Sequence, residues 1–193
     1  MNVNAVMNPI SFTATYKDKV HISYRNKNNV IKDKEVTLVE MDKTSKADRD
    51  AVFKTAVLWQ VNDSTRNYSW YILSAMERDK EPEVESEHFL AVTTQKDNFE
   101  NLDYKKVLGM VMVSEEEDCS VIDWMQVKPG YAFFDNKNSR KYFHVGKAMR
   151  NYVQQNYSAL PLYVYPAIGV EDFYIQGGFA QDTVDLHRMI YNV

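Results

Sequence analysis

The sequence predicts a single domain of the α/β class. Its 193 residues are enough to enclose one buried core, and 45% hydrophobic against 26% charged residues is a balance typical of globular proteins. Apolar segments that alternate with period two are interspersed with segments whose apolar residues recur every three to four positions. This mixture indicates strands combined with amphipathic helices.

Composition and charge exclude several classes of protein. The formal net charge is −4 and no extended basic block occurs, which argues against a nucleic-acid partner. Cys119 is the single cysteine, so an intramolecular disulfide is impossible, as expected in a reducing compartment. The first residues lack the pattern of a secretory signal, and the apolar run 107–113 is too short to span a bilayer. We therefore expect a cytoplasmic protein without a membrane segment.

Residues 1–34 are expected to form an N-terminal extension. Segments 10–16 and 20–24 alternate partly and flank the polar residues 17–19, which indicates a hairpin. A polar loop over 26–29 then leads to a strand over 35–41.

Residues 45–76 are expected to form two helices. Ser45 and Asp48 have the spacing of a capping box, and an apolar stripe on the first helix consists of Phe53, Ala56 and Val57. Ser64 is placed to cap the second helix. Its apolar residues follow helical spacing: Tyr68, Tyr71, Ile72, Ala75 and Met76. The charged stretch 78–87 contains Pro82 and ends this helix.

The rest of the chain predicts strands over 88–94, 107–114 and 121–127, followed by a third helix. The apolar residues of that helix again have helical spacing: Val145, Ala148, Met149, Tyr152 and Val153. A strand over 162–165 and a short helix over 169–176 follow, and Gly177 and Gly178 end the helix. One or two strands over 179–191 close the domain.

A strand that runs into a glycine-containing helix start predicts an anion site. The strand ends in Val127-Lys128-Pro129, and the third helix begins with Gly146 in its first turn. Backbone N–H groups in a first helical turn have no intrahelical partner, and the helix dipole is positive there. Lys141 and Lys147 add positive charge. A pyrophosphate is the expected ligand.

This segment resembles the cofactor motif of the GNAT superfamily of N-acetyltransferases. That motif runs from a strand through Val-x-Pro and a loop to Arg/Gln-x-x-Gly-x-Gly/Ala, which opens a helix. Residues 141–146 occupy this position, although Lys141 stands where Arg or Gln is usual and His144 where the first Gly is usual. The backbone N–H groups are kept in spite of both changes.

A second motif supports the same resemblance. The apolar segment 162–167 is followed by Phe173-Tyr174 and by Gly178-Phe179 at the spacing common in this family. The resemblance covers about residues 88–190, and residues 1–80 agree only in the order of elements. It divides one domain over 1–193 into the extension 1–34, a first strand and acceptor-side helices over 35–87, and an acetyl-CoA-binding core over 88–193.

The resemblance implies a mixed, mostly antiparallel central sheet with splayed middle strands and flanking helices. It also implies direct transfer of an acetyl group from acetyl-CoA to a primary amine of a small molecule, peptide or protein, without a metal. The residues then expected to bind the cofactor are Met125, Gln126, Val127, Lys141, Phe143, His144, Val145, Gly146, Lys147, Ala148 and Phe173. A backbone N–H near Met125 to Val127 is expected to stabilise the charge on the carbonyl oxygen.

Two residues are candidates for proton transfer. Asp123 lies four residues before Val127, so an unbroken strand places both on one face, and we expect its carboxylate to deprotonate the amine, directly or through water. The alternative is a surface or salt-bridged aspartate. Tyr174 is the candidate for protonating the leaving thiolate, and its alternative role is packing. Trp59, Trp70 and Tyr71 are candidates for the acceptor pocket or, equally, for the core.

Other features leave the alternatives open. The four histidines are far apart in sequence and lack the spacing of metal ligands, and the acidic turn 115–118 is expected to be solvated. A non-catalytic GNAT-fold module that binds acyl-CoA or a partner is the first alternative function. A toxin-like enzyme that acetylates aminoacyl-tRNA is the second, and the negative charge argues against it. The oligomeric state stays open, with a homodimer among the options.

Overall fold

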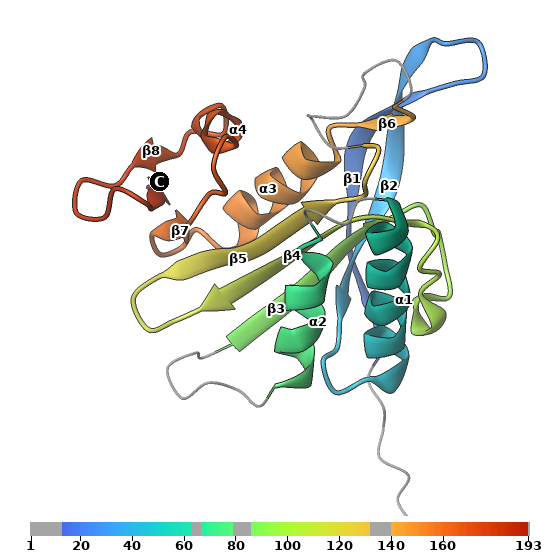
Figure 1. The fold of residues 1–193 in the computed structure, drawn as a ribbon, viewed down its shortest axis with the longest axis horizontal. Coiled ribbons are helices and arrows are strands. Elements are labelled where there is room, and N and C mark those ends of the chain that lie inside the picture. The colour runs from blue at the N-terminus through green and yellow to red at the C-terminus, as the bar shows by residue number, and fades with distance from the viewer. Residues whose placement is uncertain (1–12, 63–66, 79–85, 132–139, 193) are drawn as a thin grey trace, which may run out of the picture.

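The computed structural model describes residues 13–62, 67–78, 86–131 and 140–192. In these residues one sheet has the strand order β6-β1-β2-β3-β4-β5-β7-β9-β8 (Figure 1). The bounds are β1 Thr15–Arg25, β2 Ile31–Met41, β3 Ser86–Thr93, β4 Val107–Glu115, β5 Ser120–Val127, β6 Tyr142–Phe143, β7 Leu162–Val164, β8 Ala180–Gln181 and β9 Met189–Tyr191. All neighbours pair antiparallel except β5 and β7, which pair parallel. The mixed, mostly antiparallel α/β class is thus confirmed.

Helices cover both faces of the sheet. Helices α1 (Lys46–Asn62) and α2 (Ser69–Glu77) lie on one face, and α3 (Val145–Asn156) packs on the other (Figure 1). Each face therefore has its own hydrophobic cluster. The short helix α4 (Glu171–Ile175) lies with β7, β8 and β9 beyond the edge of β5. Among the described helices, none combines the length and apolar character that a bilayer crossing requires.

A glycine in β4 lets α3 pack closely against the sheet. A Cβ atom at Gly109 would lie 2.7 Å from the Met149 side chain and 3.0 Å from that of Val145. Both side chains come from α3 and both are buried. Larger residues at position 109 would push the first turns of α3 away from β4 and from the end of β5, which pairs with Gly109 at Val127.

The hairpin predicted within residues 10–24 is wrong. Strand β1 runs unbroken through Lys17 and Lys19, with a register shift between Tyr16 and Asp18. This segment does not form a turn because it pairs with β2, Asp18 with Leu38 and Lys19 with Thr37. The lysines also form ion pairs with β2, Lys17 with Glu40 and Lys19 with Glu35. Residues 10–12 lie outside the described part of the chain. The β1–β2 turn instead falls in the polar segment predicted as a loop.

The predicted start of α1 is confirmed. The Ser45 Oγ accepts a hydrogen bond from the Asp48 N–H at 3.2 Å, and the Asp48 carboxylate accepts one from the N–H of Asp42 at 2.8 Å. The reciprocal bond of the capping box therefore reaches past Ser45 into the preceding turn. The proposed Ser64 cap falls outside the described residues.

The apolar stripe predicted for α1 is wrong in two of its three positions. Phe53 and Val57 are 49% and 42% exposed, and only Ala56 is buried. The face that packs against the sheet is instead formed by Val52, Ala56 and Trp59. Trp59 supplies the largest apolar area on this helix, so burying its face outweighs the stripe through Phe53.

A polar network links the neighbouring strands β2, β3 and β4 near the C-terminal end of α3. His88 Nδ1 lies 2.6 Å from Glu40 and its Nε2 lies 2.8 Å from Glu115, and its ring centroid is 4.8 Å from that of Tyr157. Burial opposes a charge on the ring, but the hydrogen bonds to the two carboxylates outweigh it and raise the pKa of His88. Burial also opposes a charge on Glu40, but the hydrogen bonds from His88 and Lys17 outweigh it and lower the pKa of Glu40. An imidazolium thus joins β2, β3 and β4.

Replacing His88 by Gln should make stability less dependent on pH. A raised histidine pKa stabilises the fold fully below the unfolded value of about 6.5, and this stabilisation is lost as pH rises through the folded value. At about pH 6 the variant should lose about 1–2 kcal/mol in denaturant unfolding, and the difference should shrink by about pH 9. His187→Gln, at an exposed position, is the control. An equal loss at both pH values would show that His88 is held neutral.

Candidate functional site

Strand β5 has an open edge over its second half. It pairs with β7 only from Ser120 to Ile122, whereas its pairing with β4 continues to Val127. Within the described residues, positions 123–127 therefore have a sheet partner on one side only. This is the splayed pair of middle strands that the fold class predicts, and it leaves backbone N–H and C=O groups available to a ligand.

A β-bulge at Asp123 changes which face each residue of β5 occupies. Met112 of β4 pairs with Trp124, but the next residue, Val113, pairs with Ile122. Asp123 is therefore the extra residue, and the alternation is broken there. Trp124 packs against the cluster under α1 and α2, whereas Val127 packs against the cluster under α3.

The expectation that Asp123 shares the face of Val127 is therefore wrong. The Asp123 carboxylate accepts a hydrogen bond from Ser114 Oγ at 2.6 Å. Ser114 alternates along β4 with Met110 and Met112, which belong to the α1/α2 side. Asp123 thus lies on the α2 side of the sheet.

The environment of Asp123 suits a base that works near neutral pH. Burial raises the pKa of its carboxyl to about 6, and the nearby carboxylates of Glu116 and Glu87 raise it further, while the hydrogen bond from Ser114 and the charge of Arg78 oppose the shift. A carboxylate with this pKa is ionised above about pH 6 and accepts a proton more readily than an exposed aspartate.

The start of α3 forms an open turn of backbone donors. His144 is the N-cap residue with a left-handed φ of 65°, and its side chain does not cap the helix. The N–H groups of Val145, Gly146 and Lys147 have no acceptor among the described residues. Glycine adopts such a positive φ without steric cost, which explains why a glycine at position 144 would be less strained. The histidine adopts the same backbone and keeps the turn.

Fewer residues have a backbone N–H group available to an anion than the sequence predicted. The Ala148 N–H donates to the His144 carbonyl at 2.9 Å, so it is the first regular bond of α3. Phe143 pairs with Ser23 in the β1–β6 ladder, and its ring lies 5.3 Å from the Arg25 guanidinium. The open turn therefore consists of residues 145–147.

Three predicted cofactor residues meet at Gly146. A Cβ atom added there would lie 3.3 Å from Val127 Cγ2 and 3.5 Å from the Phe173 ring. The end of β5, the first turn of α3 and α4 thus converge on one glycine. Met125 packs against the same cluster. Gln126 faces the other way, and its side-chain oxygen accepts a hydrogen bond from the Tyr68 N–H at 2.9 Å.

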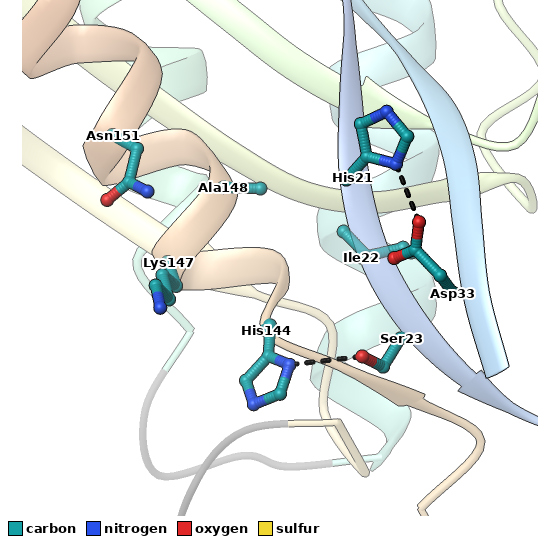
Figure 2. Close-up of a pocket in the computed structure, with 8 residues that line it drawn as sticks. All are labelled: His21, Ile22, Ser23, Asp33, His144, Lys147, Ala148 and Asn151. Atoms are coloured by element: carbon teal, nitrogen blue, oxygen red, sulfur yellow. Dashed lines mark hydrogen bonds and ion pairs between the residues drawn. The ribbon is translucent and has the colours of Figure 1, made fainter. Parts of the chain in front are cut away.

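A polar pocket of about 150 Å³ adjoins the open turn on the β1 side (Figure 2). His144, Lys147 and Asn151 are the polar residues that line it from α3. His144 Nδ1 lies 3.2 Å from Ser23 Oγ, and across the pocket His21 Nδ1 lies 2.8 Å from Asp33 Oδ2. Lys147 therefore stands beside the open turn, where a phosphate would be neutralised. Lys141 is exposed, with its ammonium 5.5 Å from the Tyr142 ring.

Tyr174 lies on the α3 side of the sheet in a closely packed site. It is 6% exposed, and its ring contacts those of Phe173 and Phe179 at centroid distances of 5.0 and 5.4 Å. Arg150 of α3 donates to the Phe173 carbonyl and so fastens α4 to α3. Burial raises the pKa of Tyr174 to about 12, and the Arg150 charge opposes the rise. Tyr174 and Asp123 therefore lie on opposite faces of the sheet.

The structure separates the three aromatic residues assigned to the acceptor pocket. Trp59 is 0% exposed and lies in the core under α1, so it does not line an open surface. Trp70 is half-buried, donates to Gln60 at 3.1 Å and meets Phe53 edge to face. Tyr71 is exposed, and it stacks on Trp124 of β5.

Sequence reasoning missed Ser114, Tyr68 and Trp124 as parts of this site. Trp124 lies next to Asp123, but without the bulge its side chain is expected on the opposite face. Tyr68 was assigned to the apolar stripe of α2, and Ser114 to the end of a strand. The pairing register of β4 and β5 brings Ser114 and Asp123 together, and stacking on Trp124 brings Tyr68 to the same side.

One group of possible metal ligands occurs among the described residues. Atoms of Glu116, Asp118 and Cys119 lie within 4.8 Å of one another. The Cys119 thiol donates to Glu116 at 3.4 Å, and burial together with the neighbouring carboxylates raises its pKa to about 12. A thiol held in its protonated form is a poor metal ligand and a poor nucleophile.

No family model matches this sequence, and no curated protein matches it. Among solved structures, the chain is similar to the crystal structure of a PaiA N-acetyltransferase from Thermoplasma acidophilum in complex with coenzyme A. The two chains share 12% sequence identity with a TM-score of 0.47, and the match covers 80% of this chain and 96% of that chain. The geometry of the site, and not this similarity, carries the functional assignment.

Replacing Ser114 by Ala should raise the pKa of Asp123 above its value of about 6. The Ser114 hydroxyl donates a hydrogen bond to the carboxylate and so favours its charged form. Without the hydroxyl, less opposes the rise in pKa that burial causes. The pKa can be followed by NMR titration of the carboxyl carbon. Ser74→Ala, at an exposed position on α2, is the matched control. An unchanged or lower pKa in Ser114→Ala would contradict the assigned hydrogen bond.

Proposed function

We propose that this protein binds acetyl-CoA and transfers the acetyl group to a primary amine. The observation that carries the proposal is the convergence at Gly146. There a strand edge and the N–H groups of a helix turn, both without partners among the described residues, meet. An extended amide-containing arm with a pyrophosphate at its end fits both features at once. The pantetheine arm of CoA has amides to pair with a strand, and its pyrophosphate suits a helix start.

In this arrangement the pantetheine arm lies along residues 123–127 as an added strand. The pyrophosphate accepts hydrogen bonds from the N–H groups of Val145, Gly146 and Lys147. Lys147 supplies a full positive charge beside them, and the pocket of Figure 2 provides further donors from His144 and Asn151. The absence of a side chain at Gly146 lets the phosphates approach the backbone.

The reaction then needs three groups around the thioester, which are Asp123, a backbone N–H of β5 and Tyr174. Asp123 takes a proton from the acceptor ammonium, directly or through a water, and the neutral amine attacks the carbonyl carbon. The new N–C bond forms as charge develops on the carbonyl oxygen, which a backbone N–H of β5 near Met125 to Val127 stabilises. The C–S bond breaks as the nitrogen loses its second proton to solvent, and the amide forms while CoA leaves as the thiolate.

Tyr174 is better suited to hydrogen bonding than to full proton donation. Its pKa of about 12 lies well above the value of about 8.5 for a thiol, so transfer of its proton to the thiolate is uphill. We assign it a hydrogen bond to the leaving sulfur, with the thiolate taking its proton from solvent. The non-catalytic alternative keeps the cofactor site but predicts no CoA release with any amine.

Replacing Gly146 by Asp should abolish most of the affinity for CoA. The new side chain meets Val127 and Phe173 and adds a negative charge beside the pyrophosphate. Isothermal titration calorimetry of CoA should show a loss of at least about tenfold, since one decade corresponds to only about 1.4 kcal/mol. Gln155→Asp adds the same charge at an exposed position near the other end of α3 and should bind as wild type. Wild-type affinity in folded Gly146→Asp would exclude the phosphate site.

Replacing Asp123 by Asn should remove the acid limb of the pH–rate profile. Wild-type kcat/KM should rise through about pH 6 as the carboxyl ionises. The variant should lose about 10²-fold or more near neutral pH, the usual contribution of a positioned base, and recover partly at high pH, where more amine is neutral. CoA affinity should be unchanged, and the exposed Glu117→Gln should behave as wild type. A profile that overlays wild type would assign the base elsewhere.

A further inference from the structure

Three aromatic side chains form a stack on the acceptor side of β5. Tyr71 lies on Trp124 with ring centroids 4.4 Å apart and 14° between planes, and Tyr68 lies 5.8 Å from Trp124 at 23°. We call Tyr68, Tyr71 and Trp124 the aromatic platform. Tyr71 is 53% exposed although Trp124 covers one face of its ring. The uncovered part of that ring is therefore available for a ligand.

The platform is fixed to the strand that carries the candidate base. Gln126 of β5 accepts a hydrogen bond from the Tyr68 N–H at the start of α2. Trp124 follows Asp123 directly in the chain, and the bulge places both on the α2 side. The candidate base and the platform therefore adjoin each other on the same face of the sheet, where one ligand can carry both an amine and a ring.

The described charges around Asp123 favour a positively charged ligand. The neighbouring carboxylates are those of Glu87 and Glu116, and Arg78 is the cation that acts on Asp123. Glu87 is paired with Lys43 at 2.6 Å. Asp123 and Glu116 are then the two carboxylates of this group that attract an ammonium ligand.

We propose that the acceptor is an arylalkylamine, with its aromatic ring stacked on Tyr71 and its ammonium group beside Asp123. This inference rests on the proposed acetyl transfer, because it names the amine that the same site takes. An aromatic pair contributes about 0.5–1.5 kcal/mol beyond simple area burial. The platform therefore distinguishes a flat ring from a saturated ring of similar size, which a plain apolar pocket does not.

The test compares three amines in an assay of CoA release from acetyl-CoA. They are 2-phenylethylamine, 2-cyclohexylethylamine and 1,4-diaminobutane. The aryl amine should have a kcat/KM higher than the cyclohexyl amine by about 2- to 12-fold, which is the stacking energy expressed as a rate ratio. Tyr71→Leu should remove this preference, and Tyr71→Phe should keep it. Phe53→Leu, at an exposed aromatic residue of the neighbouring helix α1, is the matched control and should leave the preference unchanged.

Several results would overturn the inference. Equal or better use of the cyclohexyl amine would show that area alone matters, and preference for the diamine would show that charge dominates. An aryl preference that persists in Tyr71→Leu would place the ring elsewhere. Failure of the transfer reaction itself is distinguishable, because no amine would then release CoA. In that case NMR titration of CoA-loaded protein with 2-phenylethylamine decides, and absence of shifts at Tyr71 and Trp124 overturns the inference.

Discussion

The site depends on the point at which β5 loses its second neighbour. Pairing with β7 ends at Ile122, and the bulge at Asp123 follows at once. The end of pairing leaves the edge of residues 123–127 available to an extended ligand. The bulge, in turn, directs Asp123 and Trp124 toward α2 while Met125 and Val127 stay on the α3 side. One local irregularity thus gives the strand a cofactor face and an acceptor face.

The packing on each face follows from that division. On the α3 side, Gly109 lets α3 approach β4, and Gly146 lets its first turn approach Val127 and Phe173. Arg150 then holds α4 against α3, and Tyr174 lies largely buried beside the rings of Phe173 and Phe179. On the α2 side, a buried carboxylate with a raised pKa stands beside stacked aromatic rings. In the proposed reaction, acetyl-CoA therefore approaches the open edge from the α3 side and the amine from the α2 side.

Much of the architecture was predictable from periodicity and end signals, since β3, β4, β5 and α3 fall close to their expected bounds. The first turn of α3 was also predictable, because glycine at position 146 and the preceding strand define it. The faces of β5 were not, because a bulge depends on the pairing of two strands and leaves no mark in one of them. Long-range pairing with β2 likewise keeps residues 17–19 in a continuous strand. For α1, the burial of Trp59 and not the spacing of Phe53 set the packed face.

The most direct test of the account is an NMR titration of the ¹⁵N-labelled protein with CoA. The account predicts that the amides of Val145, Gly146 and Lys147 shift together with those of residues 123–127, with one shared binding constant. That result would establish that the open strand edge and the open helix turn bind one ligand. Shifts confined to other parts of the chain, or no shifts at all, would contradict the assignment of a CoA site.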